Sequence, residues 1–216
     1  MINTLLTNPF EFFIWIIALV VAIDVHEFAH AWAAVRLGDP TPKLQGRLTL
    51  NPLAHLDPLG TFMLLLVRFG WGKPVQFDQY NLQNPRRDAA IISLAGPASN
   101  LITAAVFAIF LRLINTPFSP FNFLGNLFIP IIFLNIVLAV FNLLPIHPLD
   151  GGKILVGILP QKDAVKIDQF LHQYGIFILI LLIFPLWGGS SPVLTLLSPA
   201  ISFLFNLYTG NLFSMV

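Results

Sequence analysis

The residues best suited to chemistry lie near the end of the first long apolar stretch, in the run His26-Glu27-Phe28-Ala29-His30. Residues four apart share one face of a helix, so both imidazoles should point to the same place. Such a pair can bind zinc, and Glu27 is placed to deprotonate a water on the metal. The alternative is that these side chains only pack against polar partners. Ionisable residues inside a membrane span are costly and generally functional, which favours the metal site.

A catalytic zinc site normally has three protein ligands and keeps one position for water. The H-E-x-x-H run is not followed by a further histidine at the spacing that would complete such a site, so the third ligand must come from elsewhere in the chain. Asp150 is the only carboxylate bordering the third apolar stretch, and it follows the helix-breaking Pro145 and Pro148. A broken span could therefore bring this carboxylate to a metal. The alternative is a helix-capping aspartate, which the residue by itself favours.

The elements that position these residues must be membrane helices. The chain has 216 residues, of which 56% are hydrophobic and 10% are charged. About a quarter of the residues of a soluble domain are charged. The composition therefore predicts an integral membrane protein surrounded by a lipid bilayer. The net charge of +1 gives no indication of nucleic-acid binding, and the absence of cysteine excludes thiolate ligands and disulfides.

We expect an α-helical polytopic membrane protein with about five full spans, since a helix needs about 20 apolar residues to cross a bilayer. The spans are predicted at about 12–35, 89–111, 121–149, 170–187 and 193–216. Leu59 to Phe69 has only 11 residues and is expected to be re-entrant or interfacial. Gly46 to Leu50 is expected to form a short strand that could bind an unwound substrate along its edge.

The chain is predicted to be one membrane-embedded domain, 1–216, with a catalytic core at about 12–158 and a C-terminal helical hairpin at about 170–216. With the N-terminus outside, ten of the eleven Lys and Arg residues face the cytoplasm, and only Arg112 lies towards the outer side. From Phe12 to His26 a helix rises roughly 21 Å within a hydrocarbon core of about 30 Å. The candidate metal site is therefore expected nearer the cytoplasmic face.

The first span combines H-E-x-x-H with Asn142-Leu-Leu-Pro-Ile-His-Pro-Leu-Asp-Gly151 at the end of the third, and matching segments occur at 46–52, 55–61, 73–75, 84–87 and 95–100. Together these motifs, which cover most of residues 20–155, resemble the site-2 protease family of intramembrane zinc metalloproteases. The closest branch in pattern is the compact bacterial one without PDZ or CBS domains. The resemblance implies that His26, His30 and Asp150 bind zinc, that Glu27 is catalytic, and that Asn142 contacts the substrate or the transition state. His147 departs from the pattern, since many relatives have a proline there.

The resemblance also implies a metalloendopeptidase of the bacterial cell membrane, with its active site towards the cytoplasm. Its substrates would be single-span membrane proteins, cut within or near the transmembrane helix. One alternative is a zinc-binding scaffold that does not cut, which should lack the glutamate, whereas Glu27 is present. The other is a metal transporter, whose ligands should be spread along a pathway instead of gathering at one depth.

Several other polar residues have more than one possible role. Asn100 could form a hydrogen bond near the site or between helices. His55 and Asp57 could support the site or only hold a turn. Asp24 is expected to make a polar contact inside the helix, and His172 is expected to anchor a helix at the membrane interface.

Overall fold

The structure, a computed structural model, describes residues 7–67, 72–115, 120–184 and 191–210. Among these residues, five helices are long and apolar enough to cross a membrane, which confirms the predicted fold class. These helices are α2 (Pro9–Arg36), α6 (Pro85–Ile114), α7 (Gly125–Asn142), α9 (Gln161–Ile183) and α10 (Pro192–Thr209). The shorter elements are α3 (Thr41–Leu44), α4 (Pro52–His55), α5 (Pro58–Val67) and α8 (Asp150–Ile158), with single turns η1 (Gln79–Asn81) and η2 (Asn122–Leu124).

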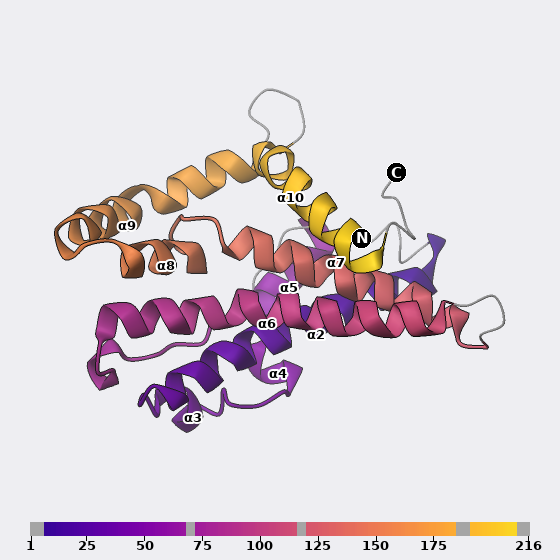
Figure 1. Ribbon diagram of the computed structural model, residues 1–216, viewed down its shortest axis with the longest axis horizontal. Coiled ribbons are helices and arrows are strands. Elements are labelled where there is room, and N and C mark those ends of the chain that lie inside the picture. The colour runs from indigo at the N-terminus through magenta and orange to yellow at the C-terminus, as the bar shows by residue number, and fades with distance from the viewer. Residues whose placement is uncertain (1–6, 68–71, 116–119, 185–190, 211–216) are drawn as a thin grey trace.

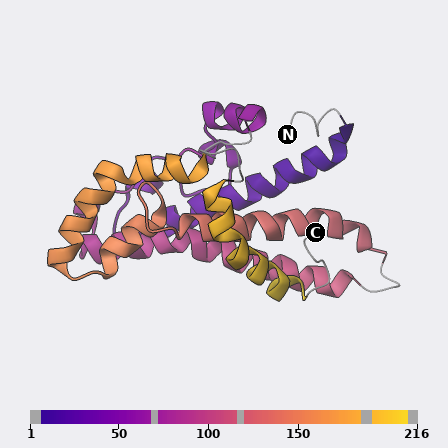
Figure 2. The same ribbon diagram turned by 90° about the horizontal axis from the view of Figure 1, so that it is seen from above.

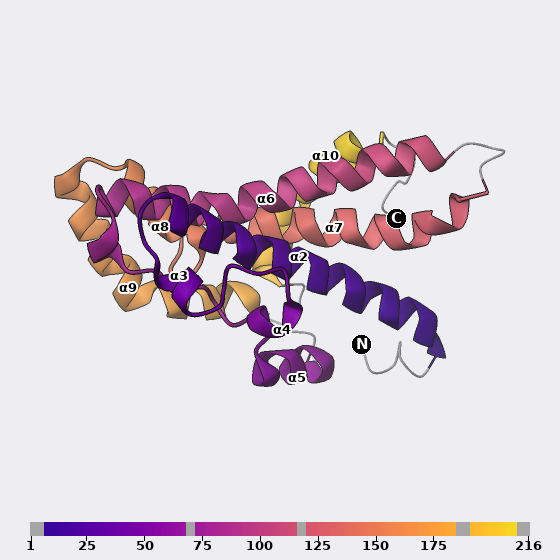
Figure 3. The same cartoon turned by 90° about the horizontal axis from the view of Figure 1, so that it is seen from below.

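Helices α2, α6 and α7 form the centre of the molecule and run along its long axis (Figures 1 and 3). Small side chains line their contacts, since Ala18, Ala22 and Ala104 are fully buried. Without large side chains between them, membrane helices approach closely and polar groups on neighbouring helices can meet. This packing brings residues of α2 within hydrogen-bond distance of residues about 75 positions further along the chain.

The third predicted span ends where its prolines indicated. Helix α7 continues through Pro130 and ends at Asn142, three residues before Pro145, and α8 begins at Asp150. Because proline lacks a backbone N–H and cannot continue a helix without losing a hydrogen bond, residues 143–149 form an irregular connection. Asp150 is therefore the first residue of a new helix at the end of an interrupted span.

The two closing helices are present, but they do not lie side by side as the predicted hairpin at about 170–216. Figures 1 and 2 show α9 leading from the end of the molecule near α8 to its middle, and α10 continuing to the other end. The Arg112 guanidinium, near the end of α6, donates to the Leu207 carbonyl near the end of α10 (2.9 Å). Helix α10 covers α7 and α6 because its apolar face packs there, with the Phe205 ring 6.0 Å from that of Phe133.

The strand predicted at Gly46 to Leu50 is wrong, because these residues form a turn and bends. Their polar groups are engaged locally: the Arg47 N–H donates to the Pro42 carbonyl, and the Thr49 carbonyl contacts the His55 ring. A strand needs a neighbouring strand for its ladder, and side chains that bond the nearby backbone compete with one. The pairing that the described residues do contain is a single bridge between Leu56 and Gly72.

The apolar segment expected to be re-entrant or interfacial forms helix α5, which has 10 residues. At 1.5 Å per residue such a helix is roughly 15 Å long, about half of a bilayer core. Figure 3 shows α5 beside the central helices and not within them.

Candidate active site

Three potential metal ligands from two helices converge in the interior. His26 and His30 lie on α2, and Asp150 is the first residue of α8. The two Nε2 atoms are 3.0 Å apart, and each lies 3.2 Å from Oδ2 of Asp150. Donors about 2.0–2.1 Å from a tetrahedral zinc are roughly 3.3 Å from one another, so this spacing fits a zinc ion.

The outer nitrogen of each imidazole has a partner that sets the tautomer. His26 Nδ1 lies 2.6 Å from Oδ1 of Asn100, and His30 Nδ1 lies 2.7 Å from the Ile92 carbonyl oxygen. Both partners accept hydrogen bonds, so each Nδ1 carries the proton and each Nε2 carries a lone pair. This is the arrangement that metal-binding histidines generally have, with the ring oriented by an outer acceptor.

Asn100 is held so that its oxygen faces His26. Its amide nitrogen donates to the Ala22 carbonyl (2.9 Å) and to Oδ1 of Asn135 on α7 (2.8 Å). Both amide protons are thereby used, and only the oxygen remains for the imidazole. Asn135 in turn donates to the Ile131 carbonyl (2.8 Å), and both asparagines are fully buried. A chain of hydrogen bonds across three helices therefore orients His26.

With these tautomers, the three atoms at the centre of the group are all acceptors. Within the part of the chain that the structure describes, Asp150 Oδ2 is buried without a hydrogen-bond partner. The groups that face it are the two Nε2 lone pairs. A buried polar atom without a partner costs free energy, and a carboxylate costs more. A cation bound by all three atoms removes this cost, so the donor set fits a metal ion chemically as well as by distance.

Two glycines allow the elements around this group to approach closely. A Cβ atom at Gly96 of α6 would lie 2.5 Å from His30 Nε2 and 2.7 Å from His26 Cε1. A Cβ atom at Gly151 of α8 would collide with the carbonyl oxygens of Leu143 and Leu144. Real Cβ atoms do not approach other atoms this closely, so both positions require glycine.

Glu27 lies beside the histidines on α2 and is held by a segment from elsewhere in the chain. The Val75 backbone N–H donates to Oε2 of Glu27 (2.8 Å). Residues 73–78 have no regular secondary structure, and the Lys73 N–H donates to the His55 carbonyl (2.8 Å). The carboxylate is therefore held next to the histidines while the chain opposite it remains irregular.

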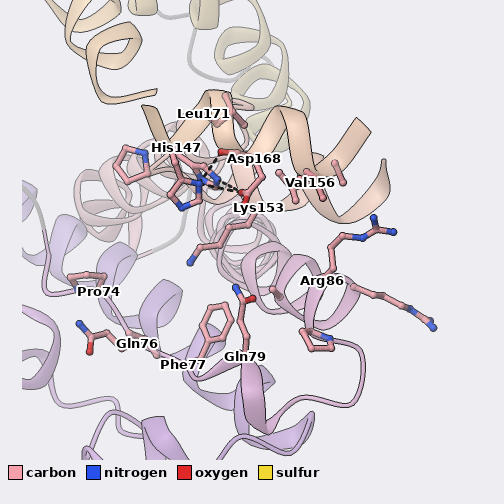
Figure 4. Close-up of a pocket in the computed structure, with 18 of the residues that line it drawn as sticks. Pro74, Gln76, Phe77, Gln79, Arg86, His147, Lys153, Val156, Asp168 and Leu171 are labelled. Carbon is pink, nitrogen blue, oxygen red and sulfur yellow. Dashed lines mark hydrogen bonds and ion pairs between the residues drawn. The ribbon is translucent and has the colours of Figure 1, made fainter. Parts of the chain in front are cut away.

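A cavity of about 1330 Å³ adjoins this segment (Figure 4). Its wall includes Val75, whose N–H binds Glu27, and Asn142 at the end of α7. The rest of the wall comes mainly from residues 72–79, the start of α6, residues 147–148, α8 and the first half of α9. Irregular backbone at membrane depth is tolerated where it lines a cavity or is buried in protein. The cavity therefore reaches Val75, the residue whose backbone N–H binds Glu27.

The structure separates the remaining candidates from the three convergent ligands. Asn142 lines the cavity and donates to the Leu138 carbonyl (3.0 Å). His55 is fully buried, with Nε2 3.6 Å from Oδ1 of Asp24. Asp57 accepts a hydrogen bond from the Gly60 N–H (2.8 Å), which is a turn contact at the start of α5.

Two residues that support the site were not singled out from the sequence. Asn135 stands alone in the apolar run of α7, and a polar residue in such a run was a usable signal. Asp39 is fully buried after α2, and its carboxylate accepts hydrogen bonds from Thr41, Asp78 and Asn81. Burial raises the pKa of Asp39, but these hydrogen-bond donors lower it by more, so the net shift is downward. Asp39 ties the end of α2 to the segment that holds Glu27.

Comparison with known proteins places this geometry in context. The model of peptidase family M50 matches residues 14–123 and 119–184. The chain is 41% identical over 174 residues to YwhC of Bacillus subtilis (strain 168), covering 78% of each protein. It is 34% identical over 178 residues to Rip2 of Mycolicibacterium smegmatis, covering 79% of this chain and 67% of the relative. Both carry the name "putative zinc metalloprotease". No solved structure matches the chain.

Proposed function

The chain belongs to peptidase family M50, and we propose that His26, His30 and Asp150 hold the zinc ion of this metalloprotease. The enzyme is an integral membrane zinc metalloprotease, and the family predicted from its motifs is confirmed. The observation that carries the ligand assignment is the convergence of the two Nε2 atoms on the buried Oδ2 of Asp150, which has no hydrogen-bond partner. Three protein ligands leave a fourth position for water, as catalytic zinc sites do.

The proposed reaction is hydrolysis of a peptide bond, with Glu27 as general base. When bound, zinc lowers the pKa of a water and polarises the carbonyl that is attacked. The Glu27 carboxylate takes the proton from the attacking water and returns it to the amine that leaves. Its hydrogen bond from Val75 orients the carboxylate through one oxygen and leaves the other for this transfer.

Asn142 is proposed to contact the substrate. One N–H of its amide is engaged by the Leu138 carbonyl, whereas the amide has a second N–H and an oxygen. The residue lines the cavity at the point where α7 ends. A peptide that enters the cavity could therefore be held there through its backbone.

The proposed substrates are single-span membrane proteins, cut within or near the transmembrane helix. The candidate site lies among membrane helices, so the polypeptide most accessible to it is one already in the bilayer. A helical substrate must unwind first, because its carbonyls are occupied by internal hydrogen bonds. The irregular residues 72–78 and the cavity beside them provide room for an unwound segment.

We place the enzyme in the bacterial cell membrane, with the proposed active site towards the cytoplasm. The end of α2, the start of α6 and helix α8 lie at one end of the molecule (Figures 1 and 3). These elements carry the basic residues Arg36, Arg86, Arg87 and Lys153, and short basic loops remain cytoplasmic. Labelling of single cysteines in this cysteine-free chain tests the orientation. Tyr80→Cys, 97% exposed in the parent, should react from the cytoplasmic side, and Phe121→Cys only from the outer side. The reverse pattern would contradict it.

The catalytic proposal is tested by incubating the purified protein in liposomes with a panel of single-span membrane proteins. Cleavage should stop when zinc is removed by a chelator and return when zinc is added back. The Glu27→Gln variant serves as the inactive control. Cleavage that persists without zinc, or in that variant, would overturn the assignment.

A further inference from the structure

A second group of two histidines and an aspartate lies at the cavity, outside the proposed active site. His147 Nε2 is 3.1 Å from Oδ1 of Asp168, and His172 Nδ1 is 3.3 Å from the same oxygen. The candidate ligand atoms all lie within 4.8 Å of one another. Figure 4 shows His147 and Asp168 joined in this way at the wall of the cavity, with Lys153 nearby. The two short separations, 3.1 and 3.3 Å, are those expected between ligands of one zinc ion. His172 Nδ1 also lies 2.9 Å from the backbone carbonyl oxygen of Asp168, so a bound ion would replace that contact.

The three residues are held by two separate elements. Asp168 and His172 are four residues apart on α9, so they share one face of the helix. His147 belongs to the connection between α7 and α8. A Cβ atom at Gly175 would lie 3.2 Å from the carbonyl carbon of His147, and one at Gly152 would lie 2.6 Å from its Nδ1. His147 therefore fits in this position because neither glycine has a Cβ atom.

Water can reach this group to complete a coordination shell. The side chain of His147 is 10% exposed, that of Asp168 43% and that of His172 70%. His147 is thus the most buried of the three, whereas the two residues on α9 are open to water.

We propose that His147, Asp168 and His172 form a second, weaker binding site for a divalent transition metal ion such as zinc. Two imidazoles and one carboxylate are a donor set that zinc accepts, with water filling the remaining positions. The ion would link α9 to the connection that precedes Asp150, and so would join two parts of the cavity wall. This proposal is independent of the catalytic assignment, because it uses none of the same residues.

The test measures zinc by equilibrium dialysis and elemental analysis on the full chain in detergent, purified without a histidine tag. The parent should bind two zinc ions per chain, one tightly and one at least about tenfold more weakly. Asp168→Asn and His172→Ala should lose the weaker ion and keep the tighter one. Gln169→Ala, an exposed change on the same helix, should keep both. Asp150→Asn should lose the tight ion and keep the weak one, which separates failure of this proposal from failure of the catalytic one.

A ligand exchange gives a second readout that does not depend on zinc counts. His172→Cys introduces the only thiol of the chain, and cadmium bound by it produces an ultraviolet thiolate charge-transfer band. With Asp168 and His147 as further ligands, cadmium should bind at least about tenfold more tightly than to Gln169→Cys. Equal cadmium affinities of the two cysteine variants, or one zinc ion per parent chain at saturation, would overturn the second site.

Discussion

The described part of the chain contains two groups of the same composition, each with two histidines and one aspartate, in different surroundings. In the buried group, His26 and His30 lie on one helix and the aspartate comes from another, and both outer nitrogens are bound by buried acceptors. In the cavity group, Asp168 and His172 share a helix, and His172 is mostly exposed. The two groups therefore have the same kinds of ligand, but they differ in how deeply the ligands are buried and in the hydrogen-bond partners behind them.

The difference shows what a catalytic metal centre needs beyond its ligands. Outer partners fix the tautomer and ring orientation, and burial strengthens electrostatic interactions with a cation. Glu27 stands next to the buried group, held by the Val75 N–H. In the part of the cavity wall that the structure describes, the charged residues other than the proposed ligand Asp168 are Arg86, Arg87 and Lys153, and none of them offers a carboxylate that could take a proton from water. We therefore expect chemistry at the buried group and reversible metal binding at the other.

The largest expected effect concerns the base. Glu27→Gln keeps the shape of the side chain but cannot take a proton, so proteolysis should fall by about 10²–10⁴-fold. Zinc content should remain that of the parent, because the amide replaces no proposed ligand. Cleavage of a single-span substrate in liposomes, measured beside elemental analysis, checks both outcomes. A variant with near-parental cleavage would remove the main distinction between the two groups.

The next effect compares the two aspartates directly. Asp150→Asn should weaken tight zinc binding by more than the roughly 10–100-fold that loss of an outer-shell partner costs. Asp168→Asn should leave the tight ion in place, because its carboxylate is not part of the buried group. Competition with a chelator of known affinity measures both constants. If the two substitutions weakened tight zinc equally, the groups would not be separate sites.

An intermediate effect is expected from the partner of His26. Asn100→Ala removes the acceptor for Nδ1 and leaves Asn135 without its donor, so zinc affinity should fall by about 10–100-fold. Thr103→Ala, one turn further along α6, is the matched control and should change the affinity little. Unchanged zinc binding by the Asn100 variant would mean that burial, and not ring orientation, distinguishes the two groups.

The smallest effect concerns the support of Glu27. Asp39→Asn places an amide N–H towards the Asp78 N–H that the carboxylate binds, and should lower the free energy of unfolding by about 1–3 kcal/mol. Because the pKa of Asp39 is lowered in the fold, its contribution is present above the unfolded value of about 3.9 and is lost as the pH falls below it. Thermal unfolding of parent and variant, both zinc-free, should show that their difference in stability decreases between about pH 6 and pH 3. A difference in stability that does not change with pH would show that the variant loses packing and not the charge of Asp39.

Much of the architecture was predictable because it depends on local composition. Apolar stretches of sufficient length indicated the five membrane helices, and Pro145 indicated the end of α7 near Asn142. The four-residue spacing of His26 and His30 placed both imidazoles on one face without knowledge of any other element. The strand at Gly46 to Leu50 could not be judged in this way, because a strand exists only with a partner elsewhere in the chain.

The sequence by itself determined that the protein is embedded in a membrane, that it carries an H-E-x-x-H helix, and which family its motifs resemble. Only the tertiary structure decided that Asp150 meets the two histidines, that Asn100 and Asn135 orient His26, and that α9 and α10 follow one another. It also decided that His172, expected to be an interface anchor, lies beside His147. Helical periodicity sets the distances between residues within one helix. Contacts between helices that are far apart in the sequence depend on how closely their backbones can approach, which residues without a Cβ atom, such as Gly96 and Gly175, permit.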